Sequence, residues 1–516
     1  MTDPTDHEPP ARPDDASPRG ARWRPRRLHF HLGIWSVLAI AAVGLFLTLA
    51  SMSLTGRAVA LPDWVAERVE TELNTAMPQG SITLRRIELG VTPKGRPRLR
   101  LVDVGLRDAS GLDIAQLNAI EGGVRLAPLF QGQFVPRTVI LTGAQVTFRR
   151  LADGTFALQF GQGNTATGNL ADVLDEFDKV FDDGILAQAV HVEALGLTIA
   201  LEDARTGRIW QVTDGRLVVG QTDKIVETAI NFDVFNQTDE LAEVEVGLRT
   251  SKADSAASLS ISFRNAAAPD IGAQTAALSF LNLIDAPIDG ALRTTIAADG
   301  TISDLAGAME IKEGAIKPNP SATPVGFGGA KGYLDFDPEQ QAIQLTGVTF
   351  TSDLGEIELD GKLMLDDYLN DRPQSVIGQI RVNRARFAAP DLFDQPMTID
   401  RGFADFKVKL SPFSFDLGQA VLFRGSTRFN LDGRITAAAD EWAIALNAHV
   451  PDIDVGNLKL VWPKTVAPKP RDWMFRNVEA GALRDVHMAL RGPSLKEAVL
   501  LMGAEATGAA VRVMKQ

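Results

Sequence analysis

Apolar and polar residues alternate along most of the chain after residue 80. Short runs place Leu, Ile, Val or Phe at every second position, as in Leu197-Thr198-Ile199-Ala200-Leu201 and Phe406-Lys407-Val408-Lys409-Leu410. Successive side chains of a strand point to opposite faces, so this period predicts many short strands, each with one buried face. Asp-Gly dipeptides tolerate the positive φ angles of tight turns, and we expect some of them to be hairpin tips. They begin at positions 153, 183, 214, 289, 299, 360 and 432.

Three segments have the spacing of helices instead. Residues 62–77 begin with a proline and repeat apolar residues at spacings near four, which predicts a helix. Residues 170–181 predict a second amphipathic helix. Ser494 with Glu497 is typical of a capping box and predicts a third helix opening just before Val499 and Leu500, followed by a strand over residues 509–514.

The predicted fold class is therefore mainly β with a few short amphipathic helices. Many antiparallel strands over this length are compatible with several sandwiches, a propeller or one elongated, curling sheet. No fixed repeat of the propeller kind and no Cys…Trp…Cys framework occurs. Residues 318–330, rich in Pro and Gly, are the best candidate boundary between a β-rich region over 61–317 and a second one over 331–516.

The N-terminal part has a different pattern. Residues 1–31 are rich in Pro, Asp and Arg without periodicity, which predicts a disordered tail. Residues 32–54 contain no charge, and a helix of that length rises about 34 Å against a hydrocarbon core of about 30 Å. Arginines at 19, 22, 24, 26 and 27 precede it, so the predicted transmembrane helix leaves the tail cytoplasmic and exports the rest. A cleaved signal peptide ending near Ala58-Val59-Ala60 is the alternative.

Composition narrows the chemistry that this chain can perform. The 516 residues carry a net charge of −13, which argues against nucleic-acid binding, and the absence of cysteine excludes thiolate chemistry. The six histidines lie at 7, 29, 31, 191, 449 and 487, and only those at the N-terminus are close in sequence. No Gly-x-Ser-x-Gly, His-Glu-x-x-His or Walker pattern occurs. We therefore expect no catalytic site, no metal site and no cofactor.

Several stretches of the sequence have residue patterns that are typical of one known family. The first opens with Leu61-Pro62-Asp63-Trp64 and continues through Gly95 to Leu99 and Val102-Asp103-Val104; the second runs from Leu126-Ala127-Pro128 through Gly143-Ala144 to Asp153-Gly154. The third contains Leu201-Glu202-Asp203 and Trp210. The most specific stretch comes late, and it consists of Trp462, Pro463, Arg471, Trp473, Asn477 and Gly481. Together these stretches resemble the AsmA-like superfamily of Gram-negative envelope proteins, in its YhdP-like branch.

The resemblance implies an inner-membrane anchor followed by a long, curved, antiparallel β-sheet in the periplasm. In that family an apolar groove on the concave face is thought to carry phospholipid acyl chains between the inner and outer membranes, and no catalytic residues are known. Members of the branch usually continue well beyond the last stretch, whereas this sequence stops at Gln516. We therefore expect a shortened member, a partial reading frame or a chain whose sheet a partner completes.

The alternation of side chains along a strand predicts which residues would line such a groove. Side chains two apart share a face, which gives the candidates Ile82, Leu84, Val139, Leu141, Val146, Phe148, Leu197, Ile199, Leu201, Ile357 and Leu359. The 25 phenylalanines against 2 tyrosines suit plain apolar binding more than carbohydrate or peptide recognition. Period alone is also what the closed core of a sandwich shows. For Trp462, Arg471 and Trp473 we expect a structural cation–π contact rather than ligand recognition.

Three functional hypotheses follow from this sequence. The first is a membrane-anchored lipid conduit that supports outer-membrane biogenesis, with phospholipid and the inner membrane as partners. The second is a non-enzymatic assembly factor whose edge strands dock other envelope proteins. The third, a tethered enzyme with an active site built from distant residues, has no motif in its favour.

Overall fold

The computed structural model describes residues 40, 43–44, 47, 51, 58–76, 80–91, 97–108, 113–124, 136–151, 156–159, 167–168, 189–204, 208–235, 241–253, 256–273, 276–298, 301–369, 372–438, 441–493 and 498–512. These residues belong to two units, one containing residues 1–59 and 89–97 and the other containing residues 60–88 and 98–516. The tail over 1–31 and most of the predicted span over 32–54 lie outside the described residues. None of the described helices is both long and apolar enough for a membrane crossing.

The second unit is mainly β, as the alternation predicts. Its N-terminal part pairs one helix with the first strands of a sheet that contains 26 of the described strands. The elements in chain order are β1 (Val59–Ala60), α2 (Asp63–Ala76), β2 (Gly80–Val91), β3 (Pro97–Asp108), β4 (Asp113–Val124), β5 (Pro136–Thr142), β6 (Gln145–Arg150), β7 (Phe156–Gln159), β8 (Thr167–Gly168), β9 (His191–Asp203), β10 (Arg208–Gln221), β11 (Ile225–Val234), β12 (Ala242–Ser251) and β13 (Ala257–Ala267).

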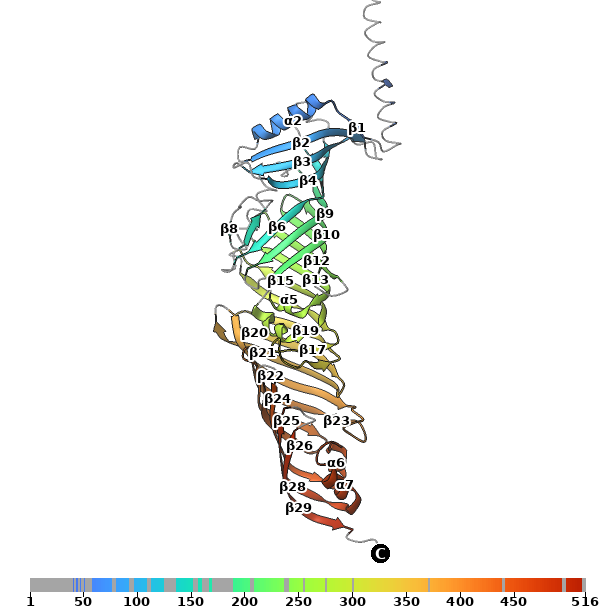
Figure 1. Cartoon of the computed structure of the whole chain (residues 1–516), viewed down its shortest axis with the longest axis vertical. Helices are drawn as coiled ribbons and strands as arrows, with labels where there is room; N and C mark the ends of the chain where they lie inside the picture. Colours follow the sequence, from blue (N-terminus) through green and yellow to red (C-terminus); the bar gives the residue numbers. More distant parts are fainter. Residues whose placement is uncertain are drawn as a thin grey trace, which may run out of the picture. The chain divides into compact units, whose positions relative to one another are not determined.

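The C-terminal part continues the same sheet with longer strands and a few short helices (Figure 1). Its elements are α5 (Ala268–Gly272), the 3₁₀ helix η1 (Ala276–Leu283), β14 (Ile284–Asp285), β15 (Pro287–Ile296), β16 (Ile302–Ile311), β17 (Gly314–Ile316), β18 (Val325–Phe327), β19 (Gly329–Asp337), β20 (Ala342–Ser352), β21 (Gly355–Leu369), β22 (Arg372–Phe387), β23 (Met397–Ile399), β24 (Arg401–Lys409), β25 (Ser414–Arg424), β26 (Thr427–Ala438), β27 (Glu441–Asp454), α6 (Val455–Val461), α7 (Pro468–Asn477), β28 (Val478–Gly492) and β29 (Val499–Val511).

Pairing in this sheet is almost entirely antiparallel and between strands that follow one another along the chain. From β9 onward the order of hydrogen-bonded strands is β9, β10, β11, β12, β13, β15, β16, β19, β20, β21, β22, β24, β25, β26, β27, β28 and β29. The sheet continues across residues 318–330, because β16 pairs directly with β19.

The exception to this order lies at β9. Its first half pairs in parallel with β5 and its second half in parallel with β6, so two strands share one edge of β9. Gly143 (φ 74°) lies between β5 and β6, and Gly196 (φ 61°) forms a bulge between the two halves of β9. The bulge lets Ala194 and Leu197, three positions apart, both join the core beneath α2.

Three sets of helical segments cover parts of the apolar side of the sheet. Helix α2 packs over the core around Ile87 and Val104, which are 2% and 1% exposed. The connection formed by α5, η1 and β14 inserts Leu278 and Leu281, both fully buried, against the central strands. Helices α6 and α7 cover the face of β27 and β28. A small sheet of β14, β17 and β18 accompanies the second of these covers.

Several sequence-based predictions can now be compared with the structure. The helix expected over 62–77 is confirmed as α2, whereas the one expected over 170–181 lies outside the described residues. The helix expected to begin near Val499 is wrong: residues 499–511 form strand β29, because Leu500 and Met502 pair with Leu490 and Met488 of β28. Of the strand expected over 509–514, residues 509–511 are the end of β29, and residues 513–514 lie outside the described residues.

Candidate functional site: the apolar face of the sheet

One row of cross-strand partners crosses the sheet from β5 to β29, and we call it the central row. Each member lies directly opposite the next in the strand pairing, and none is charged. The members are Val139, Val192, Val219, Thr228, Leu248, Leu259, Thr294, Leu305, Phe336, Ile343, Leu363, Gly378, Phe406, Leu417, Gly433, Leu446, Leu490 and Leu500. The row lies across the strands, so it connects successive strands through one apolar stripe.

The central row is buried in its first part and partly exposed further along. Val139, Val192 and Val219 are 8%, 4% and 2% exposed, because they pack in one cluster with Val226 and the loop residue Ala189. Ile343 and Leu363 are also buried, next to η1. From Phe406 to Leu490 the larger members are only partly buried. Leu248, Leu259 and Phe336, earlier in the row, are partly buried as well.

Glycines on the apolar side keep this face shallow. A Cβ on Gly290 would lie 2.8 Å from the ring of Phe263, and one on Gly433 would lie 2.7 Å from Leu446. A large side chain of the neighbouring strand thus occupies the space over each glycine that the side chain of another residue type would fill. Five further glycines of the sheet are covered in this way, namely Gly307 by Leu292, Gly332 by Val348, Gly361 by Ile380, Gly378 by Phe406 and Gly402 by Leu422.

The predicted groove residues fall into two groups. Ile82, Leu84 and Leu197 are buried in the core beneath α2, with Leu141 and Ile199 packed against it. Val139 belongs to the adjoining cluster with Val192. Phe148 and Leu201 are cross-strand partners, as are Val146 and Ile199, but the side chains of Val146, Phe148 and Leu201 lie outside the described set.

Ile357 and Leu359 form the second group. They are partly exposed on β21, on the same side as Leu363 and Leu365. Ile357 lies opposite Phe350 and Leu359 opposite Val348. Because Ile357 and Leu359 are partly exposed, they are better candidates for contact with a ligand than the buried Ile82, Leu84 and Leu197 beneath α2.

The late stretch of the sequence forms a structural latch around α6 and α7. Trp462 is buried, and its Nε1 donates to the carbonyl of Val466 at 2.7 Å. Arg471 is 6% exposed, and its Nε donates to the carbonyl of Trp462 at 3.2 Å. The cation–π contact expected between Arg471 and a tryptophan is wrong, because the guanidinium lies over Phe475, 4.2 Å from the ring centroid.

The same latch holds a distant loop. Asp394, in the loop between β22 and β23, accepts hydrogen bonds from Arg471 and from Lys464, the latter at 3.1 Å. The backbone amide of Lys464, which follows Pro463, also donates to the carbonyl of Leu392 at 2.6 Å. Both basic groups lower the pKa of Asp394, Arg471 first.

The remaining members of that stretch have local roles. Trp473 is 53% exposed and takes no part in the buried cluster. Asn477 caps the end of α7 by donating to the carbonyl of Trp473 at 2.7 Å. Gly481 has φ 131° and lies against the backbone of Ala509, where a Cβ would be 2.9 Å from the Ala509 Cα.

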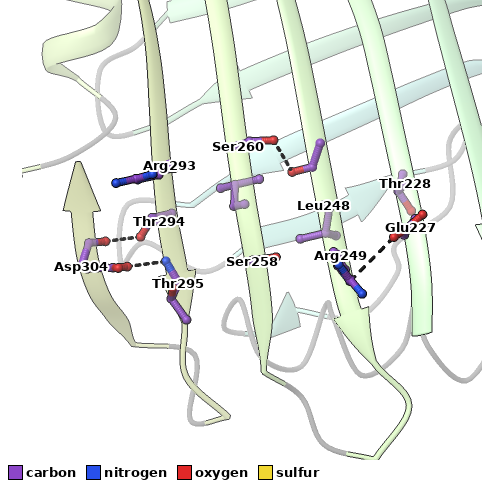
Figure 2. Close-up of a pocket in the computed structure, with 12 residues that line it drawn as sticks. Glu227, Thr228, Leu248, Arg249, Ser258, Ser260, Arg293, Thr294, Thr295 and Asp304 are labelled. Carbon is purple, nitrogen blue, oxygen red and sulfur yellow. Dashed lines mark hydrogen bonds and ion pairs between the residues drawn. The ribbon is translucent and has the colours of Figure 1, made fainter. Parts of the chain in front are cut away.

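The polar side of the sheet carries a pocket of about 370 Å³ across β11 to β16 (Figure 2). Its lining is dominated by charged and hydroxyl groups that bond to one another. Arg249 pairs with Glu227 at 3.7 Å, and Asp304 accepts from the amide of Thr295 at 2.5 Å. Gly247 and Ser260 create the space between the longer side chains. Thr228, Leu248, Leu259 and Thr294 of the central row also line this pocket, so at these strands the row borders charged and hydroxyl groups.

One cluster escaped the sequence analysis. His449 and His487 are 38 positions apart in the sequence, and no motif connects them. The pairing of β27 with β28 nevertheless makes them direct cross-strand partners beside Asp485. Only the register of this hairpin, with α6 and α7 inserted between its strands, reveals the contact.

A comparison of this chain with protein families, with curated proteins and with solved structures finds no match. The arguments for a function therefore rest on the geometry described above and on the resemblance noted in the sequence.

Proposed function

We propose that the apolar face of this sheet binds phospholipid acyl chains and that the protein supports lipid transport between the inner and outer membranes. The observation that carries the proposal is the central row, an uninterrupted uncharged stripe whose part from Phe406 to Leu490 is incompletely covered. In this proposal the partly exposed face is an open groove on the concave side of a curved sheet. The resemblance to the AsmA-like superfamily supports the same assignment.

The chemistry of this face suits a sliding, variable ligand. Acyl chains offer no hydrogen-bonding groups, so a lining of Leu, Ile, Val and Phe binds them through burial alone, worth about 0.8 kcal/mol per methylene. Large side chains that lie over glycines make a low floor without deep side-chain pockets. Such a floor does not fix one chain length or one degree of unsaturation.

The N-terminal segment would hold the sheet at its donor membrane. We propose that residues 32–54 form a single transmembrane helix, with the arginine-rich tail in the cytoplasm and the sheet in the periplasm. The sequence contains no Walker loop, so the proposal takes any directional flow from a partner or a gradient.

Site-specific photocrosslinking in cells tests the proposal. A photoreactive amino acid at Ile357 or Leu359 is on the same face of β21 as Leu363 of the central row, whereas one at Glu358, between them, is on the opposite face. We expect phospholipid adducts at 357 and 359 and none at 358. A second matched pair, Ile199 and Thr198 on β9, lies next to the core beneath α2 and should give weaker labelling.

Silence at 357 and 359, with equally silent probes at Leu417 and Leu446 in a protein that accumulates normally, would overturn the lipid proposal. The edge strand β29 would then deserve the same probes. It pairs only with β28 among the described strands, and Val499 and Leu501 are 65% and 66% exposed. Protein adducts at β29 instead of lipid adducts at β21 would favour an assembly factor that acts by strand addition.

A further inference from the structure

Two histidines stack across neighbouring strands on the polar side of the sheet. His449 of β27 lies directly opposite His487 of β28, and their ring centroids are 4.5 Å apart with an angle of 15° between the planes. Val450 and Val486, the next residues along each strand, are 1% exposed and belong to the core beneath α6. Because side chains alternate along a strand, the two imidazoles face away from that core.

Asp485 completes the cluster from the same strand as His487. Its Oδ1 lies 2.9 Å from Nε2 of His449 and 3.2 Å from Nε2 of His487. Asp485 has φ 51°, and the pairing of β28 with β29 shifts register between Arg484 and His487. This bulge turns the carboxylate toward both imidazoles. All three side chains are accessible, with exposed fractions of 36%, 62% and 64% for His449, Asp485 and His487.

The carboxylate oxygen of Asp485 lies at 2.9 and 3.2 Å from the two imidazole nitrogens, which is the spacing of neighbouring metal ligands, and a small rotation of the stacked rings would turn both nitrogens toward one ion. The donor atoms of the three residues lie within 4.8 Å of one another, and no other group of this kind occurs in the described part of the chain. A metal ion about 2.1 Å from each donor separates neighbouring donors by about 3.0 to 3.4 Å, depending on the coordination angle. We propose that His449, Asp485 and His487 bind a divalent transition-metal ion such as Zn²⁺, Ni²⁺ or Cu²⁺.

The identity of the donors selects the class of ion. Two imidazole nitrogens and one carboxylate suit borderline first-row cations, whereas Ca²⁺ and Mg²⁺ take oxygen ligands. The nearest further amide, Asn430, donates to the carbonyl of His449 and accepts from Arg428 at 2.8 Å. Its oxygen is therefore engaged, and water would complete the coordination. A bound ion would join β27 to β28 on the side opposite α6 and α7, independently of any lipid on the apolar face.

Zinc titration of the full-length protein in detergent tests the site. The probe is ZnCl₂ in competition with a chromophoric chelator, and the comparison is between wild type and the double variant His449→Gln/His487→Gln. We expect the double variant to lose one equivalent of bound zinc and the zinc-dependent rise in thermal midpoint. Electron paramagnetic resonance of the Cu²⁺ form should show two coordinated nitrogens in wild type only.

His191→Gln is the matched control. His191 also lies on a strand two residues from a carboxylate, with Nε2 3.8 Å from Glu193, but no second imidazole of the described residues pairs with it. The three N-terminal histidines are present in every variant and contribute the same background. Asp485→Asn keeps a residue that tolerates positive φ, so it tests the carboxylate without disturbing the bulge; it should weaken zinc binding at least about tenfold.

Identical zinc titrations for wild type, the double variant and Asp485→Asn would overturn the proposal. Circular dichroism and thermal midpoints measured with excess chelator establish that each variant is folded. A double variant that fails this check is replaced by Asp485→Asn, whose unchanged zinc affinity would contradict the site by itself.

Discussion

At the scale of single residues, Asp-Gly pairs inside the strands have two roles at once. The glycine lies on the apolar side beneath a large neighbour, as Gly290 does under Phe263 and Gly361 under Ile380. The aspartate before it faces the polar side. Asp360 accepts from the backbone amide of Gly347 at 2.8 Å, and that donor is a bulge residue with φ 60°. Asp289 binds the amide of the bulge residue Asn265 in the same way, at 2.7 Å.

Gly378→Ala tests whether the glycines of the apolar side are needed for the close approach of large side chains from the neighbouring strand. The added methyl group would overlap the ring of Phe406, so we expect a loss of about 1 to 3 kcal/mol in the free energy of unfolding. Gly220→Ala is the control, since Gly220 lies in the interior strand β10 with nothing within 4 Å of its Cβ position; a change within about 0.5 kcal/mol is expected. Urea denaturation measures both variants. Equal losses would mean that backbone flexibility, and not the close approach, sets the cost.

The Asp-Gly pairs also show what a local pattern leaves open. Some of the seven pairs were expected to be hairpin tips; the structure places those at 214, 289, 360 and 432 within β10, β15, β21 and β26 instead. The dipeptide tolerates both environments, because a glycine needed for positive φ and one needed for close packing have the same side chain. The partner that decides between them, such as Phe263 or Leu446, lies on another strand.

At the scale of elements, the latch around Arg471 joins two parts of the sheet that are far apart in sequence. Helices α6 and α7 occupy the connection between β27 and β28, while Asp394 belongs to the connection between β22 and β23. Arg471 is buried and bridges the two by contacting Trp462, Phe475 and Asp394. The cover formed by α6 and α7 is therefore tied to the β22–β23 connection as well as to the strands below it.

The latch gives an acid-sensitive contribution to stability. Arg471 and then Lys464 lower the pKa of Asp394 in the folded protein. The folded state thus binds the proton less readily than the unfolded chain, so the contribution is present above the ordinary aspartate pKa and is lost as pH falls through the lowered folded value. We expect Asp394→Asn to be less stable than wild type near neutral pH, with the difference disappearing as pH falls below the ordinary aspartate pKa of about 4.

Urea midpoints measured across that pH range check this expectation. Asp391→Asn, a change in the same loop at a residue without an ion-pair partner among the described residues, serves as the control and should follow wild type. A constant difference between Asp394→Asn and wild type down to the lowest pH would show that the contact does not depend on the charge of Asp394.

Elements differ in how far their own sequence determines them. Helix α2 has a proline start, an apolar stripe and a sheet to pack against, so its prediction from spacing is correct. The capping pattern at Ser494 and Glu497 was equally regular, yet residues 499–511 extend the sheet as β29. These thirteen residues, which open with the four consecutive apolar residues of 499–502, can hydrogen-bond to β28, and this long-range pairing outweighs a local cap.

At the scale of the whole sheet, the two edges of a strand need not be equivalent. Strand β24 is paired on both sides, with β22 and β25, whereas β29 is paired only with β28 among the described strands. Half of the amides of an edge strand point away from its partner. Hydrogen exchange should therefore be at least about tenfold slower in β24 than in β29.

Mass spectrometry of peptides covering residues 401–409 and 499–511 provides the measurement. Residues 414–424 of β25, also paired on both sides, are the control and should match β24. Equal protection of β24 and β29 would mean that the outer edge of β29 is hydrogen-bonded in solution, as a partner strand would make it.

The mainly β class follows from the alternation alone, because the period of two persists over hundreds of residues. The central row cannot be predicted from the alternation, because each bulge shifts the pairing register by a number of residues that the sequence of one strand does not reveal. His449 and His487 illustrate the difference: each was interpreted as a lone histidine, and only the β27–β28 register places one on the other. The parallel junction of β5 and β6 with β9 is equally invisible to periodicity.

Pairing between consecutive long strands has an evolutionary consequence. From β10 to β29 each long strand needs only the one before it and the one after it, so a duplicated or deleted hairpin leaves the flanking strands with suitable partners. The number of strands can then change by unequal recombination without a new fold. Homologous chains of this kind would differ in length by units of about two strands, with insertions and losses concentrated away from the β5–β9 junction and the Arg471 latch.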